Sequence, residues 1–390
     1  MALCPRAHVG VPPMSLALRG RSLALADEAV AKLRLARTEG VGPLTYQRLL
    51  ARCGTAGEAI AALPDIAQSA GRQRLDICPA AAAERELHTL HKHKGRMIFF
   101  GDAGYPHLLA MLPDPPPVLS ILGDVSVLST RSVGLVGARN ASANGQRMAE
   151  ALATELAGQA ITIVSGMARG IDAAAHEGAL HVGRTVAAVA GGLDQPYPPE
   201  HADLQARIAA GGAVVTEAPW GTAPQSRHFP RRNRIIAGLV LGVVVVEAAL
   251  RSGSLITARL AQDANREIFA VPGSPLDPRC RGCNDLIRQG AHLAESAADV
   301  LAQLPDHPLR EGMTRRPPAG MAEAAQAWSD ADLPLVRAEL RRLLSASPTD
   351  IDEAIRRSQF APATVMAALS QLELALEVEV LPGGRACLLK

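Results

Sequence analysis

The chain has 390 residues, 48% of them hydrophobic and 3% aromatic, which is long enough for about two or three domains packed mainly with aliphatic side chains. Its 40 basic and 38 acidic residues give a net charge of +2, so the chain is not one of the strongly basic proteins that bind nucleic acid through their overall charge. Any such function must come from local clusters of charge.

Membrane, metal and redox functions find little support in the sequence. No stretch of about eighteen apolar residues is free of charge, so we expect no membrane span and no membrane partner. The cysteines are scattered, which is typical of a protein of the reducing cytoplasm. Cys280 and Cys283 alone have C-x-x-C spacing, and without a second pair we expect no metal and no cofactor; zinc or redox chemistry is the alternative.

The first quarter of the chain is predicted to be helical. Residues 1–23 are too broken by proline and arginine for a signal peptide, so we predict a disordered leader or a misassigned start. Residues 24–95 have Ala, Leu, Arg and Glu at helical spacing, which predicts a small helical domain. Within it, GVGPLTYQRLL resembles a helix-hairpin-helix element, whose turn amides can approach a phosphate; a plain tight turn is the alternative.

A parallel α/β domain is predicted over residues 96–304. From Ser132 onward, apolar runs alternate with amphipathic helices: VGLVGA, AITIVSGM, TVAAVAGG, AVVTEAP, GVVVVEAA and EIFAVPG. Because these runs are continuously apolar, we predict a parallel sheet that is buried on both faces. Right-handed crossovers then place the carboxyl ends of the strands at one rim.

That rim is predicted to bind an anion. Small or polar residues follow each strand, in the segments GARNAS, SGMARGID, GGLDQPYPP, EAPWGT, EAALRSGS and VPGSP. Glycine lets backbone amides approach a ligand, and helices that begin at the rim direct their positive ends toward it. Arg139 and Arg169 follow the first two strands. A dinucleotide site would instead carry an acidic residue there to bind the ribose, so the two arginines favour a phosphate chain as the ligand. The alternative is that either arginine pairs with Asp172 or another carboxylate inside the fold.

The segment SRHFPRRNRIIAG, residues 226–238, holds four arginines, one histidine, one phenylalanine and no acid. Like charges repel, so an anionic partner would stabilise the cluster, and guanidinium groups suit phosphate oxygens. Phe229 offers a face on which an unpaired base can stack. The pattern therefore predicts a site for single-stranded nucleic acid, with a solvated charged loop as the alternative.

Two further helix starts are candidate contacts. Ser252, Gly253 and Ser254 open a helix after a buried strand, where an oxyanion can bind, although capping alone also explains these residues. Asn284 opens a short helix in RGCNDLIRQGA, and a simple cap is again the alternative.

No catalytic motif is present, so we expect a protein that is not an enzyme. The sequence has no P-loop, H-E-x-x-H or G-x-S-x-G. We interpret Asp172 and His176 as a structural pair, and nothing places Glu217 and Glu247 at a scissile bond. The alternative is a nucleotide or nucleoside-phosphate hydrolase on the same rim, but such enzymes carry P-G-G-x-G-T where this chain has VPGSP.

The chain ends in a predicted winged helix. Residues 305–333 are polar and rich in proline, which indicates a linker. Residues 334–390 predict three helices and two strands about a Pro-Gly-Gly turn. The segment Thr364–Leu374 takes the place of the recognition helix. It carries almost no basic charge, so a protein contact or spacer role competes with the reading of duplex DNA.

Several segments, in this order, are similar to the DNA-processing protein A (DprA/Smf) family: SGMARGIDAAAH, GGLDQPYPPEH, HFPRRNRIIAG, VVVVEAALRSGSLITARLA, and IFAVPGS with GCNDLIRQGA. The resemblance implies an extended Rossmann-like fold, flanked by an N-terminal helical domain of the SAM or helix-hairpin-helix type and a C-terminal winged helix. It also implies a dimer that binds incoming single-stranded DNA in natural transformation, protects it, and helps to load the recombinase RecA. The positions implied to contact the DNA are Gly137, Arg139, Ser165, Gly166, Arg169, Phe229, Arg231, Arg232, Asn233, Arg234, Ser254 and Asn284.

Overall fold

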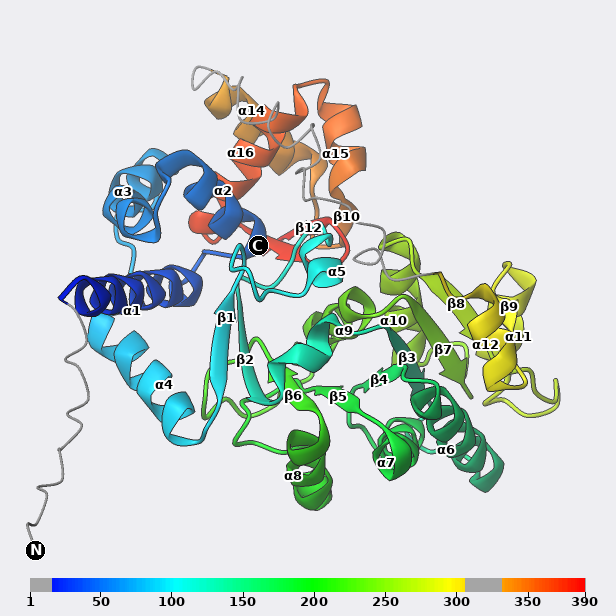
Figure 1. Cartoon of the computed structure of the whole chain (residues 1–390). Helices are drawn as coiled ribbons and strands as arrows, with labels where there is room; N and C mark the ends of the chain where they lie inside the picture. The colour runs from blue at the N-terminus through cyan, green and yellow to red at the C-terminus, as the bar shows by residue number, and fades with distance from the viewer. Residues whose placement is uncertain (1–15, 306–331, 390) are drawn as a thin grey trace, which may run out of the picture.

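The computed structural model of the chain describes residues 16–305 and 332–389 (Figure 1). The predicted leader lies for the most part outside these residues, although α1 begins at Leu16, and the predicted linker has only its ends within them. The helical first part contains α1 (Leu16–Arg37), α2 (Pro43–Cys53), α3 (Ala56–Ser69) and α4 (Ala80–Lys92). Pro43 begins α2, and Thr55 and Glu58 form a capping box at the start of α3.

A nine-stranded sheet forms the centre of the molecule, in the order β1-β2-β6-β5-β4-β3-β7-β8-β9. Pairing is parallel from β6 through β9, whereas β2 pairs antiparallel with both β6 and β1. The strands are β1 (Arg96–Phe99), β2 (Val118–Gly123), β3 (Ser132–Gly137), β4 (Thr162–Ser165), β5 (Thr185–Ala188), β6 (Ala213–Thr216), β7 (Gly242–Val246), β8 (Glu267–Ala270) and β9 (His292–Leu293). The predicted parallel sheet is thus confirmed.

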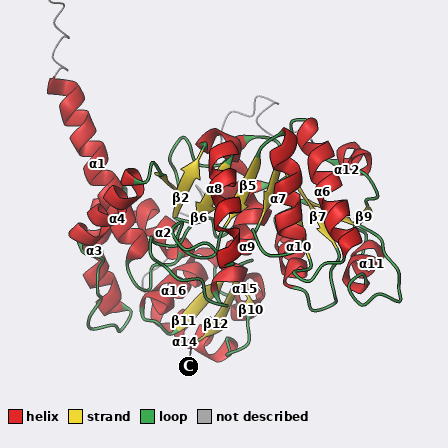
Figure 2. Ribbon diagram, turned by 90° about the horizontal axis from the view of Figure 1, so that it is seen from below, coloured by secondary structure: helices red, strands yellow, loops and turns green. Residues whose placement is uncertain are grey.

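Helices cover both faces of the sheet, as Figure 2 shows. One face packs against α6 (Ala143–Gly158), α7 (Ile171–Val182), α8 (Ala202–Gly211) and α12 (Ala297–Gln303). The other packs against α5 (His107–Ala110), α9 (His228–Leu239), α10 (Gly253–Asp263) and α11 (Arg281–Arg288), and the short turns η1 (Val125–Ser129) and η2 (Pro199–His201) complete the domain. Burial on both faces explains why the strands are continuously apolar.

The last part is a winged helix, as predicted. It contains α14 (Leu333–Leu343), β10 (Thr349–Asp350), α15 (Ile351–Ser358), α16 (Pro362–Leu374), β11 (Val378–Leu381) and β12 (Arg385–Leu388). The short strand β10 pairs with β12 and extends the predicted hairpin to a three-stranded sheet. Helix α16, in the place of the recognition helix, packs against α2 of the helical first part.

A buried carboxyl group joins the winged helix to the helical part. Glu373 of α16 accepts a hydrogen bond from the Thr45 hydroxyl at 2.5 Å and another from the backbone N–H of Gly42. A Cβ atom on Gly42 would lie 2.1 Å from Oε1 of Glu373, so the turn has room for the carboxyl group only because Gly42 has no side chain. The turn that resembles a helix-hairpin-helix element is therefore filled by a group of the protein itself.

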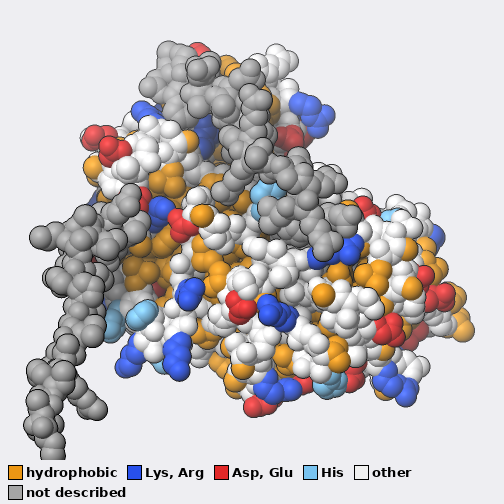
Figure 3. Space-filling model, viewed as in Figure 1, with side chains coloured by type: hydrophobic (Ala, Val, Ile, Leu, Met, Phe, Trp, Pro, Cys, Tyr) orange, Lys and Arg blue, Asp and Glu red, His pale blue; other side chains and the backbone are white. Residues whose placement is uncertain are grey.

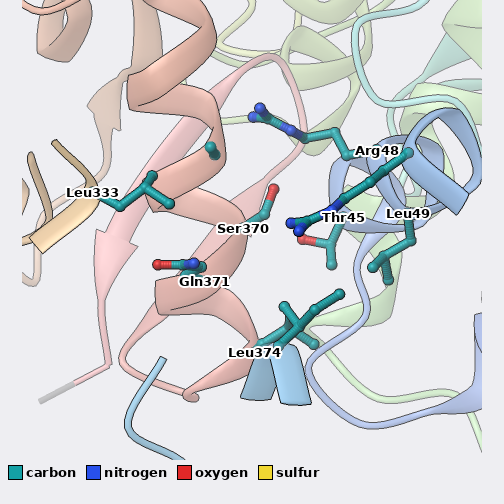
Figure 4. Close-up of a pocket in the computed structure, with 10 residues that line it drawn as sticks. Thr45, Arg48, Leu49, Leu333, Ser370, Gln371 and Leu374 are labelled. Carbon is teal, nitrogen blue, oxygen red and sulfur yellow. The ribbon is translucent and has the colours of Figure 1, made fainter. Parts of the chain in front are cut away.

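A pocket lies at the same junction, between α2 and α16 (Figure 4). Arg48, which lines it, donates a hydrogen bond to the backbone carbonyl of Ala363 at 2.9 Å and so helps to hold the two parts together. The full lining is Thr45, Arg48, Leu49, Arg52, Ile66, Leu333, Ala367, Ser370, Gln371 and Leu374. None of these is a residue that the sequence analysis assigns to the rim, so we attribute the pocket to the packing of the two parts.

Replacing Glu373 with glutamine tests this junction. Burial raises the pKa of Glu373 from 4.5 to about 7, so the folded chain keeps a proton that the unfolded chain loses above pH 4.5. The contribution of this proton to the stability of the folded chain is complete below pH 4.5 and is lost as the pH rises to about 7. The free energy of unfolding falls by about 3 kcal/mol over this range. We expect urea unfolding to show a smaller loss of stability over this range for Glu373→Gln than for the wild type. Identical pH profiles would contradict the assignment.

Candidate nucleic-acid interface

An aromatic ring and two guanidinium groups meet at the rim of the sheet. Phe229 lies in the first turn of α9, and the guanidinium carbon of Arg139, in the turn after β3, is 5.0 Å from the centre of its ring. The guanidinium carbon of Arg232 is 5.8 Å from the same centre, and Tyr197 packs edge-on at 5.5 Å. Arg139 is exposed, so this group presents one cation and an aromatic surface to solvent.

Arg232 holds this group in place from inside the protein. Its side chain is buried, and it donates hydrogen bonds to the backbone carbonyls of Gly166, directly after β4, and Ala188, the last residue of β5, the latter at 2.6 Å. Burial lowers the pKa of Arg232 to about 10; Asp172 opposes this shift and Arg139 adds to it. Arg232 therefore fixes α9 to two strand ends and is a positioning group for Phe229.

Arg234 is also buried, and its charge is neutralised by the protein. It forms an ion pair with Glu217 and lies 3.8 Å from Asp114, whose backbone carbonyl it also contacts. Burial raises the pKa of Asp114 to about 6, partly offset by Arg234. The four arginines of the 226–238 segment are therefore not one exposed cluster. Arg227 and Arg231 face solvent, whereas the burial of α9 from its second turn encloses the other two.

The two remaining arginines of the predicted site form ion pairs at the surface. Arg231 lies 2.6 Å from Glu379 of β11, so the winged helix contacts the edge of the rim. Arg169 pairs with Glu200 at the surface, and not with Asp172 or another carboxylate inside the fold. Both arginine side chains are about half exposed or more, and surface ion pairs of this kind contribute about 0–1 kcal/mol, so an incoming phosphate can compete for them.

The small residues of the predicted site shape the rim. A Cβ atom on Gly137 would lie 1.9 Å from the carbonyl oxygen of Val246, so only glycine fits at the end of β3. Ser165 is fully buried and donates to the carbonyl of Leu135 at 2.5 Å, while Gly166 accepts from Arg232. These residues set the course of the backbone at the first two strand ends.

The polar residues on the other side of the rim have partners within the protein. Asn233 contacts the carbonyl of Gly253 at 3.5 Å, and the hydroxyls of Ser254 and Ser252 lie 2.7 Å apart at the start of α10. The interpretation of Asn284 as a helix cap is wrong, because α11 begins at Arg281 after Cys280 and places Asn284 one turn in. Its amide instead bonds to both backbone groups of Gly273, at 3.2 and 2.8 Å.

Glu247 fills the anion position at the start of α6. Its carboxylate accepts hydrogen bonds from the backbone N–H of Ser142, at 2.8 Å, and from the hydroxyl of the same residue. A nucleotide-binding Rossmann domain keeps this helix end free for a pyrophosphate. A Cβ atom on Gly145 would lie 2.5 Å from the Glu247 carboxyl carbon, so Gly145 leaves the space that this carboxylate occupies.

The residues considered for catalysis have structural partners. Asp172 and His176 are both buried but do not bond to one another: Asp172 accepts from the backbone N–H of Ala168 at 3.3 Å, and Nδ1 of His176 lies 2.7 Å from the Thr185 hydroxyl. Burial lowers the pKa of His176 to about 3. Tyr197 was not among the predicted contacts, although an aromatic residue that follows a strand is a recognisable signal in a chain with only 3% aromatic residues.

Comparison with known proteins decides the family. A family model described as DNA recombination-mediator protein A matches residues 96–305, and models of the DprA-like N-terminal HHH domain and the DprA winged helix domain match residues 26–89 and 323–384. The chain belongs to the DprA/Smf family. Protein Smf of Escherichia coli is 37% identical to it over 322 residues, which cover 81% of this chain and 84% of that protein.

Two further DprA proteins show the same relationship. DNA processing protein DprA of Bacillus subtilis is 44% identical over 204 residues, or 52% of this chain and 69% of that protein. The X-ray structure of DprA from Streptococcus pneumoniae matches with a TM-score of 0.60 and 36% identity, covering 71% of this chain and 98% of that chain. Within the residues that the structure describes, no helix is long and apolar enough to span a membrane, and no group of three metal-ligating side chains occurs.

Two methionine substitutions separate the positioning arginine from the exposed one. Arg232→Met removes the buried hydrogen bonds to the carbonyls of Gly166 and Ala188, so we expect its free energy of unfolding to fall by about 2 kcal/mol. Arg139→Met removes a solvent-facing group and is expected to cost about 1 kcal/mol or less. Urea denaturation measures both. Equal losses would contradict the division of roles.

Proposed function

We propose that this chain binds single-stranded DNA without sequence preference and does not act as an enzyme. The observation that carries the proposal is the group formed by Arg139 and Phe229 at the rim, held from below by Arg232. A cation beside an aromatic ring suits a polynucleotide whose bases are unpaired, since the phosphate meets the guanidinium and the base can stack on the ring. A paired base offers no free face to this group.

The exposed cations supply the attraction for the DNA backbone. Arg139, Arg169 and Arg231 would bind phosphates, while Gly137, Ser165 and Gly166 shape the turns that hold them. In this structure Arg234 is bonded to carboxylates and Arg232 to carbonyls, so we assign these two a supporting role. Asn233, Ser254 and Asn284 remain predicted contacts at the far side of the rim.

The same geometry disfavours the hydrolase alternative. Glu247 occupies the helix end that a nucleoside di- or triphosphate would need, and Asp172 and His176 are buried beside structural partners. Membership of the DprA/Smf family adds support for a role in DNA processing. From the family resemblance we also propose a homodimer in the cytoplasm that protects incoming strands during natural transformation and hands them to RecA.

The salt dependence of binding tests the contact at Arg139. Log affinity for single strands falls with log salt at about −0.7 per neutralised phosphate, so three exposed arginines predict a slope of about −2. Arg139→Met should flatten this slope by about 0.7 for every oligonucleotide sequence alike. Fluorescence anisotropy with labelled oligonucleotides across a salt series measures it. A variant with the parent's slope would exclude Arg139 as a phosphate contact.

The ion pair between Arg231 and Glu379 gives a second test. Glu379→Gln removes the carboxylate that competes with a DNA phosphate for Arg231, so we expect the affinity for single strands to rise. The rise should be at most about fivefold, because an exposed ion pair contributes at most about 1 kcal/mol. The same substitution in an Arg231→Met background should have no effect. A gain that persists without Arg231 would show that Glu379 acts by another route.

A further inference from the structure

A second basic surface lies at the end of α4, away from the arginines of the rim. We call it the α4 patch: the exposed side chains of His88, His91, Lys92, His93, Lys94 and Arg96. No acidic residue occurs in the sequence between Glu86 and Asp102. Figure 3 shows Lys, Arg and His side chains gathered over the end of α4 and the start of β1, at the lower left of the view.

Helix capping accounts for only part of the α4 patch. Cations in the last turn of a helix interact favourably with its negative end, which explains His91 and Lys92. Lys94 and Arg96 lie beyond the end of the helix at Lys92, so this interaction does not explain them. Within residues 16–305 and 332–389, no ion pair joins Lys92, Lys94 or Arg96 to a carboxylate.

Unlike the cations of the α4 patch, two cations of α1 form ion pairs with the acids that flank the patch in the sequence. Lys32 pairs with Asp102 at 2.8 Å, and Arg37 pairs with Glu86 at 2.7 Å, so the acids that flank the α4 patch in sequence are already engaged elsewhere. Lys92 and Lys94 therefore keep their positive charge open to solvent, whereas Arg96 also interacts electrostatically with Asp124. Such a surface is suited to a polyanion.

An aromatic side chain flanks the α4 patch. Trp220 stacks on His93 with ring centres 4.6 Å apart and 29° between the planes. Trp220 belongs to the loop between β6 and α9, which is fixed by a hydrogen bond from the backbone N–H of Gly221 to Asp194 at 2.7 Å. Positive charge beside a fixed aromatic ring is the combination that binds single-stranded nucleic acid.

The same loop connects the α4 patch to the rim. Residues 217–227 run from the end of β6 to the start of α9, where Phe229 lies. The sheet order places β1 four strand positions from β4, which is about 20 Å at the usual strand spacing of about 4.8 Å. At the spacing of about 3.4 Å per nucleotide of a base-stacked strand, about six nucleotides cross this distance, and a strand with unstacked bases crosses it in fewer.

We propose that the α4 patch, with Trp220, is a second contact for the same single strand, which it binds where the strand leaves the rim. This inference rests on the proposed function of the rim and extends it. Charge and the flanking ring favour DNA over an acidic protein, and the loop of residues 217–227 connects Trp220 to the start of α9, where Phe229 lies. Affinity then depends on strand length, because a short strand reaches only the rim.

Oligonucleotide length is the test. In Lys92→Gln/Lys94→Gln, we expect the affinity for a dT strand of about 20 nucleotides to fall by about 25-fold near 0.1 M salt, and the salt slope to flatten by about 1.4. Binding of a dT strand of about three nucleotides, which is too short to reach the α4 patch from the rim, should not change. The matched control is Arg356→Gln/Arg357→Gln, which removes two exposed charges from α15 and should leave both affinities unchanged.

The outcomes separate the two proposals. Short-strand binding by the wild-type chain tests the rim alone, so its absence counts against the proposed function. A patch variant that binds the long strand as well as the wild type does, or that loses both lengths equally, overturns the second contact. Equal losses in the patch variant and in the α15 control would show that only total charge matters, and would overturn it too.

Discussion

The rim of this protein depends on one buried guanidinium group. Moving a charged side chain out of water costs several kcal/mol unless hydrogen bonds replace the lost hydration. In Arg232, hydrogen bonds to the backbone carbonyls of Gly166 and Ala188, at the ends of β4 and β5, replace that hydration. Helix α9 is thereby fixed against the sheet, and Phe229 takes a defined place beside Arg139.

A second feature weighs against a nucleotide site at the start of α6. Within the sheet domain, Glu247 occupies this helix start with a carboxyl group of the protein itself. Outside that domain, Glu373 of the winged helix occupies the turn before α2 in the same way. Both lie beside a glycine that leaves room for them, Gly145 and Gly42. The exposed arginines at the rim are then the groups left for an external phosphate, which fits a long polyanion better than a small nucleotide.

The sequence predicted the parallel sheet, its rim, and the three-part organisation, because buried strands and helices leave periodic patterns that depend on local residues. It predicted the meeting of Arg139 with the 226–238 segment for the same reason, since strand ends share one rim. It could not divide the arginines of α9 into exposed and buried ones. That division depends on Asp114, Glu217 and Glu379, which are distant in sequence and meet α9 only in the folded chain.

Cross-linking would test the central claim most directly. A single-stranded oligonucleotide that carries bromodeoxyuridine, irradiated in complex with the full chain and mapped by mass spectrometry, reports which side chains stack on its bases. We expect cross-links at Phe229 and Tyr197, with Trp220 added for long strands. Cross-links confined to the winged helix, with none at the rim, would contradict it.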